Sequence, residues 1–220
     1  MSEDADFVIP GKPTPDRAGN VGRLNRVPRS IRDVADMVGI DLVSFDGERY
    51  ESQAHGLWEV RYRSAILPPT GSVVVETAIR PVLLPPRRVA MRQLLSRQLM
   101  PGYGEAYCWT LDYLEVRAEK VRAAFTREEP ELRDFYDLSL LAKEGVDMAS
   151  AEFVRVLDAK LAEVGVAPLS EQPPSFSLTG SRRTAALDGS ARLAAVLRID
   201  EPPFELDQVL RFYDKLWEKR

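Results

Sequence analysis

Two carboxylates at the start of the chain are spaced so that they could share a metal ion. Asp4 and Asp6 alternate within the segment M-S-E-D-A-D-F, which spans Met1 to Phe7. Because successive side chains of a β-strand point to opposite faces, this spacing places both carboxylates on one face of a strand. Carboxylate oxygens are ligands of hard divalent cations. The pair predicts a site for one or two such cations, and the alternative is a solvated acidic terminus.

Charged residues in the middle of the chain form a second group of candidates. Asp134 falls in line with Leu138 on a helical face, so its carboxylate is expected to be buried and to need a cationic partner. Lys120 and Arg127 share one line of the preceding helix, seven residues apart. Structural salt bridges of Asp134 and Asp137 with these cations, or with the neighbouring arginine, are the alternative to a functional role.

Motifs around these residues resemble those of a known enzyme family. A-E-K-x-x-A is followed by R-D-x-Y-D-L, whose first aspartate lies fourteen residues after the lysine. These motifs resemble the third and fourth motifs of the AbiEii/AbiGii nucleotidyltransferase toxins, a branch of the polymerase-beta-like nucleotidyltransferases. The N-terminal segment is similar to the family's second motif, (S/T)-x-D-x-D-F, with Ser2, Asp4 and Asp6 in the key places. The resemblance implies that Lys120 contacts nucleotide phosphates and that Asp134 is required for activity.

The resemblance also implies a ligand set. Asp4 and Asp6 would bind magnesium, which bridges the phosphates of a nucleoside triphosphate (NTP). A third acidic residue on a neighbouring strand is common in this superfamily, and Glu76 is the only carboxylate between Ser72 and Arg80. We assign Ser2, Lys120 and Arg127 to nucleotide binding, with Ser2 a regulatory or transient phosphoryl acceptor by analogy. An ion pair of Glu76 with Arg61 or Arg63 is the alternative for that residue.

The activity implied is that of the toxin half of a toxin–antitoxin system. It would transfer a nucleotide from an NTP to the 3′ end of tRNA or to another macromolecule, and a cognate antitoxin would hold it in check. The family's first motif, a Gly-Gly-Ser/Thr turn ahead of the aspartates, is not found. We expect either a start upstream of Met1 or a shortened member. The alternative function is a catalytically impaired module that binds an antitoxin or RNA.

The elements expected to carry these residues define an α+β fold. Changes of period predict strands at about 41–45, 56–66 and 72–80, and helices at about 112–126, 131–143, 151–163 and 204–218. We expect a polymerase-beta-like sheet half over 1–108 and a helical half over 109–220 that supplies Lys120 and Asp134 to the site. A helix with a basic side is predicted around 87–97, and 168–190 is predicted to be irregular.

Composition excludes several other classes. The chain has 220 residues, one Cys, one His and a formal net charge of −4. An internal disulfide is impossible, and zinc sites or Ser-His catalysis that rely on several histidines are nearly excluded. No apolar run reaches the length of a membrane span, so we expect a cytoplasmic protein. Any attraction to nucleic acid must come from local basic patches such as 87–97.

Overall fold

The computed structural model describes residues 4–50, 54–63, 70–90, 107–169, 171, 178, 180–188, 193, 197 and 204–217. The chain is a mixed α+β protein, as predicted, and divides into two compact units, Met1–Val82 and Leu83–Arg220. We describe each unit by itself. The expected division into a sheet half over 1–108 and a helical half over 109–220 stays a prediction.

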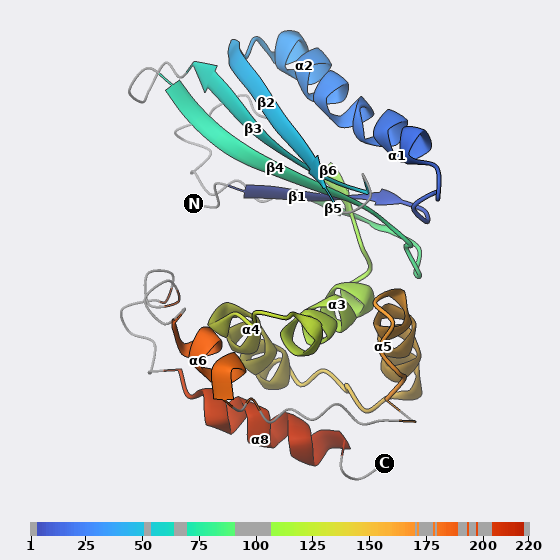
Figure 1. The fold of residues 1–220 in the computed structure, drawn as a ribbon, viewed down its shortest axis with the longest axis vertical. Helices are drawn as coiled ribbons and strands as arrows, with labels where there is room; N and C mark the ends of the chain where they lie inside the picture. Colours follow the sequence, from blue (N-terminus) through green and yellow to red (C-terminus); the bar gives the residue numbers. More distant parts are fainter. Residues whose placement is uncertain are drawn as a thin grey trace. The chain divides into compact units, whose positions relative to one another are not determined.

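The first unit is a four-stranded sheet with two helices against one of its faces (Figure 1). The sheet order is β1-β4-β3-β2, with β1 parallel to β4 and the other pairs antiparallel. Its elements are β1 (Asp4–Pro10), α1 (Arg17–Leu24), α2 (Arg26–Val38), β2 (Leu42–Tyr50), β3 (His55–Arg63) and β4 (Thr70–Arg80). The strands predicted at about 41–45, 56–66 and 72–80 are confirmed as β2, β3 and β4, although β2 extends to Tyr50 and 64–66 lie outside the described residues. Gly39 ends α2 in a left-handed conformation with φ 74°.

Alternation along the strands separates an apolar face from a charged one. The face toward the helices carries the core of this unit, centred on Leu24, Trp58, Val60, Val75 and Ile79. The Trp58 indole packs against two positions without side chains, because a Cβ at Gly47 or Gly56 would lie only 2.0 or 2.3 Å from the ring. Burial of one face fixes the strand register, since a slip by one residue would expose the whole apolar set.

Two side chains of α1 fix the loop that leaves β1. The Arg23 guanidinium donates to the carbonyl oxygens of Pro10 (2.8 Å) and Lys12 (2.9 Å). Asn20 is buried and exchanges two hydrogen bonds with the backbone of Thr14, each 2.8 Å long. The end of the strand that carries Asp4 and Asp6 is thus held by buried and charge-assisted hydrogen bonds rather than by packing alone.

The second unit is mainly helical, with a two-stranded ribbon. Its elements are β5 (Arg87–Ala90), β6 (Tyr107–Thr110), α3 (Tyr113–Thr126), α4 (Leu132–Lys143), α5 (Ala151–Glu163), α6 (Gly180–Asp188) and α8 (Leu206–Trp217). The four predicted helices are confirmed, whereas the prediction that 168–190 is irregular is wrong over 180–188, which form α6. The helix predicted from 87 is wrong over 87–90, which form β5 by pairing with β6. The rest of that segment, 91–97, lies outside the described residues.

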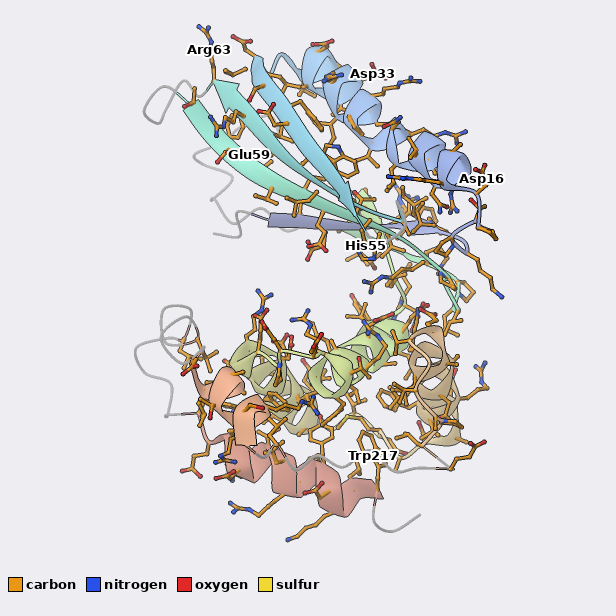
Figure 2. All side chains as sticks on the ribbon, in the orientation of Figure 1. Asp16, Asp33, His55, Glu59, Arg63 and Trp217 are labelled. Carbon is orange, nitrogen blue, oxygen red and sulfur yellow. The ribbon has the colours of Figure 1, made fainter. Side chains whose placement is uncertain are left out.

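Aromatic side chains form the centre of the second unit's core. Phe125 makes an edge-to-face contact with Phe135 at 6.2 Å between ring centroids, and the rings of Tyr213 and Trp217 lie within 6.5 Å of it. Figure 2 shows Trp217 directed from α8 into the helical unit, where it is 3% exposed. The buried Tyr213 hydroxyl donates to the carbonyl oxygen of Leu138 (3.0 Å), which joins α8 to α4.

Among the described helices, none combines the length and the apolar character needed to cross a bilayer.

Candidate active site

The first group of candidate residues lies on two neighbouring parallel strands. Asp6 of β1 and Glu76 of β4 are partners in the strand register, and Asp4 is aligned with Val74. Partner residues project to the same face, and neighbouring strands lie about 4.8 Å apart. Asp6 and Glu76 are therefore adjacent on the face that α1 and α2 leave uncovered. The prediction that Glu76 stands beside the Asp-x-Asp strand agrees with this register.

Neither carboxylate of this pair is neutralised by the basic residues of the sheet. Asp6 is exposed and Glu76 is half-buried. Among the described residues, neither forms an ion pair within 4.0 Å, whereas Arg61 binds Glu59 (2.9 Å) and Arg63 binds Asp41 (3.1 Å). Hydrogen bonds from Arg61 lower the pKa of the Glu59 carboxyl. The alternative in which Arg61 or Arg63 pairs with Glu76 is therefore wrong.

The carboxylates of Asp6 and Glu76 are suitable ligands for a hard divalent cation whose remaining ligands come from a substrate and water. Over the described part of the chain, no three His, Cys, Asp or Glu side chains are gathered into a ready metal cluster. Magnesium differs from calcium or zinc here, because it is commonly held by one or two carboxylates together with substrate phosphates and water. Two adjacent carboxylates that have no cationic partner among the described residues are a suitable donor set for such a site.

The second group of candidates lies on α3 and α4 of the helical unit. Lys120 Nζ is 2.5 Å from Asp137 Oδ2, and the side chains are 48% and 32% exposed. Structural salt bridges were the alternative for these residues, and one is present at this position. Because both side chains are still reached by solvent, the pair contributes little to stability, and the Lys120 ammonium stays accessible to an anion.

Asp134 is buried beside Arg127. Its side chain is 5% exposed, and its Oδ2 lies 3.0 Å from Arg127 Nη1 without a well-directed hydrogen bond. Arg127 also reaches Glu131 at 3.4 Å. Burial raises the pKa of the Asp134 carboxyl above its ordinary value, and the charge of Arg127 only partly opposes this effect. The expectation of a buried carboxylate with a cationic partner is confirmed, but the compensation is incomplete.

A buried charge cluster that we did not predict anchors the helix carrying Lys120. Lys160 of α5 is 1% exposed and lies 2.8 Å from Glu115 and 3.1 Å from Glu119, both on α3, and 3.2 Å from Glu163. Burial lowers the pKa of Lys160, but the hydrogen bonds and negative charges of the three glutamates outweigh it and raise the pKa overall. The sequence feature that could have predicted the burial of Lys160 is its position on the apolar face of its helix, beside Leu157 and Leu161.

Glu115 has a second role at the entrance to the helical unit. Its carboxylate accepts hydrogen bonds from the backbone N–H groups of Leu83 (3.1 Å) and Leu84 (3.0 Å). The start of this unit is thereby fixed to the N-terminal turn of α3. Of the predicted site residues, Ser2 lies outside the described residues, and of Asp4 only the backbone is described.

Comparison with known proteins identifies the family. The model of a family described as the nucleotidyl transferase AbiEii toxin of a type IV toxin–antitoxin system matches residues 1–215. The chain belongs to this AbiEii family. It is therefore a nucleotidyltransferase, as the motifs predicted, and its substrate is an NTP.

Solved structures with a similar fold include other nucleotidyltransferases. A Helicobacter pylori protein assigned as a nucleotidyltransferase is 18% identical and has a TM-score of 0.47, with 100% of this chain and 80% of that chain covered. MenT4, a nucleotidyltransferase toxin from Mycobacterium tuberculosis, is 17% identical and has a TM-score of 0.46, with 98% and 77% covered. These likenesses are weak, so membership of the AbiEii family rests on the family match. No curated protein matches the chain.

Proposed function

We propose that this AbiEii-family protein transfers a nucleotide from an NTP to the 3′ end of a tRNA and requires magnesium. The observation that carries the proposal is the in-register pair of Asp6 and Glu76 on the uncovered face of the sheet. Asp6 and Glu76, with Asp4 as a further ligand, would hold the magnesium ion, which would supply positive charge to neutralise the phosphates of the NTP.

The helical unit supplies cations and one buried acid. Lys120, which is half exposed and held by Asp137, contacts the phosphates of the NTP. Arg127, 40% exposed, adds a second donor group for the same phosphates, and Asp134 holds its guanidinium in place. Ser2 completes the nucleotide-binding set. These cations favour the departure of a highly charged leaving group, because they stabilise the charge that it gains.

The reaction is a displacement at phosphorus. The 3′-hydroxyl oxygen of the acceptor forms a bond to the α-phosphorus of the NTP, and the bond from that phosphorus to the pyrophosphate oxygen breaks. The hydroxyl proton passes to a base, and pyrophosphate leaves. Growth inhibition would follow from modification of the tRNA end, and a cognate antitoxin would prevent it. We place this reaction in the cytoplasm, where a free thiol such as Cys108 stays reduced.

Incorporation of labelled nucleotide into tRNA tests the proposal. Asp6→Asn, Glu76→Gln and Lys120→Ala should each lower the rate by about 100-fold or more, because a metal or phosphate contact supplies several kcal/mol to the transition state. Glu59→Gln is the matched control, since Glu59 lies on the same sheet face but is paired with Arg61. Thermal midpoints of all variants show whether the fold is kept.

Three outcomes are informative. Loss of transfer in the three site variants and not in the control supports the proposal. Equal incorporation by wild type and every variant contradicts it. Tight RNA or antitoxin binding without any incorporation, at every magnesium concentration tried, favours the alternative function of a binding module.

A further inference from the structure

The two-stranded ribbon of the helical unit exposes one face made of an arginine and two aromatic residues. In the β5–β6 register Arg88 is opposite Trp109, and Ala90 is opposite Tyr107. Because opposite residues share a face, these four side chains project to the same side of the ribbon, and all four are exposed. The other side carries Val89 and Cys108, which are half-buried.

The geometry of this face is ordered by cation–π contact. The Arg88 guanidinium carbon lies 4.1 Å above the centroid of the Tyr107 ring. Directly across the ribbon from Arg88, Trp109 is 70% exposed, although indole is a side chain that folding normally buries. On the opposite side of the ribbon, Arg87 lies 4.7 Å over the Tyr113 ring and 3.9 Å from the Asp112 carboxylate, so Arg88 is the cation of the exposed face.

These features select a ligand that is both aromatic and anionic. An exposed indole face suits a planar ring, and the adjacent Arg88 guanidinium suits phosphate. Double-stranded RNA hides its base faces within the stack, whereas unpaired nucleotides present base and phosphate together. An acidic peptide would satisfy the arginine but not the indole. The chain as a whole has a formal net charge of −4, so the positive charge of the ribbon is local and does not belong to a generally basic protein.

We propose that the face formed by Arg88, Tyr107 and Trp109 binds unpaired nucleotides of an RNA. One base stacks on the Trp109 indole, while Arg88 contacts the adjoining phosphate. This inference rests on the proposed function in one respect, namely that the bound RNA is the acceptor of the nucleotide. Binding itself requires neither NTP nor metal, so it can be measured separately from transfer.

Tryptophan fluorescence of the full chain gives a direct test. The chain has three tryptophans, of which Trp58 and Trp217 are 3% exposed, so the quencher acrylamide reaches mainly Trp109. A mixed-sequence single-stranded RNA of ten nucleotides, without NTP or metal, should protect this fluorescence from acrylamide. A duplex of the same sequence should protect it much less. Unchanged quenching at saturating single-stranded RNA overturns the inference.

Affinities of variants for the same labelled RNA test the roles of the residues. Trp109→Ala should weaken binding by about 5- to 150-fold, which is the range for loss of one stacked base. Arg88→Gln should weaken it and reduce the slope of log affinity against log salt by about 0.7. Phe212→Ala is the matched control, since it removes a 42% exposed aromatic ring from α8 of the same unit. Thermal midpoints confirm that the variants are folded.

The outcomes separate this inference from the proposed function. Equal RNA affinity for wild type and Trp109→Ala overturns the inference even if nucleotide transfer is intact. Weakened binding in Trp109→Ala supports it even if no nucleotide is transferred. A wild-type dimer in light scattering that Trp109→Ala converts to a monomer would assign the face to a protein contact and overturn the RNA assignment.

Discussion

At the scale of single residues, Asp134 is the most informative position. A carboxylate that is 5% exposed, with one imperfectly directed cationic partner, costs free energy that an uncharged residue of the same shape would save. Such a carboxylate is needed for stability only if its removal would leave a buried cation unpaired. The Arg127 side chain is 40% exposed, so water would solvate its charge without Asp134. The structure therefore favours a functional reason for the charge.

Asp134→Asn should abolish nucleotide transfer and leave stability at pH 7 unchanged or higher by about 1 kcal/mol. Urea denaturation measures the stability, and labelled-nucleotide incorporation measures the activity. Glu144→Gln, which removes the 3.1 Å contact with Arg117 at the end of α4, is the control for loss of an ion pair. A loss of several kcal/mol in Asp134→Asn with transfer intact would make Asp134 a structural residue.

The pH dependence of stability follows from the same carboxyl group. Burial raises its pKa above the ordinary value of 3.8, so in a window that begins near that value the native state binds a proton that the unfolded state releases. The free energy of unfolding contributed by this group consequently falls as the pH rises through the window. Asp134→Asn should flatten this part of the profile, measured by urea denaturation in steps above pH 4. An unchanged slope would contradict the assignment.

At the scale of elements, the packing of the Trp58 indole against β2 requires a residue without a side chain at position 47. A Cβ at Gly47 would lie 2.0 Å from the indole Cδ1, which no packed structure tolerates without movement. Gly47→Ala should therefore destabilise the first unit by about 1–3 kcal/mol. Gly22→Ala is the opposite control, because a Cβ there meets nothing within 4 Å and lies inside α1. It should stabilise by about 0.5–1 kcal/mol. Thermal unfolding measures both, and equal effects would contradict the packing argument.

Elements that bury a periodic apolar face were predictable from the sequence. Helices α3, α4, α5 and α8 lie within two residues of their predicted bounds, because their burial follows the helical period. Strand β5 was not predictable, since its partner β6 lies far along the chain and pairing overrides the local pattern. Helix α6 has a polar sequence, and it forms because Ala186 is buried and Arg183 binds Asp207 at 2.6 Å.

The candidate site was predictable for a different reason. Asp6, Lys120 and Asp134 stand in short motifs whose spacing resembles that of a family, and the register of β1 with β4 adds Glu76. The buried Lys160 cluster was missed because its charges are neutralised between two helices, a contact that one-dimensional spacing does not reveal. The exposed ribbon face was missed for the same reason, since strand pairing creates it.

At the scale of the whole molecule, the two units have separate cores. The cluster around Trp58 and the cluster around Phe135 share no residue. A substitution in one core should therefore lower hydrogen-exchange protection chiefly in its own unit. Gly47→Ala should affect peptides of β2 to β4, and Tyr213→Phe, which removes the hydroxyl bonded to Leu138, should affect α4 and α8. Exchange followed by mass spectrometry checks this, and equal loss across both units after either change would show one cooperative unit.

The Glu163 carboxyl beside Lys160 couples the unfolding of the helical unit to the release of a proton. Burial raises the pKa of the Glu163 carboxyl, and the nearby charge of Glu119 raises it further, although Lys160 opposes both effects. In weakly acidic solution Glu163 is therefore more often protonated in the folded protein than in the unfolded chain, and unfolding releases that proton. The buffer takes up the released proton, and its protonation enthalpy adds to the heat absorbed on unfolding. The calorimetric enthalpy of unfolding should therefore differ between acetate and an amine buffer at the same pH.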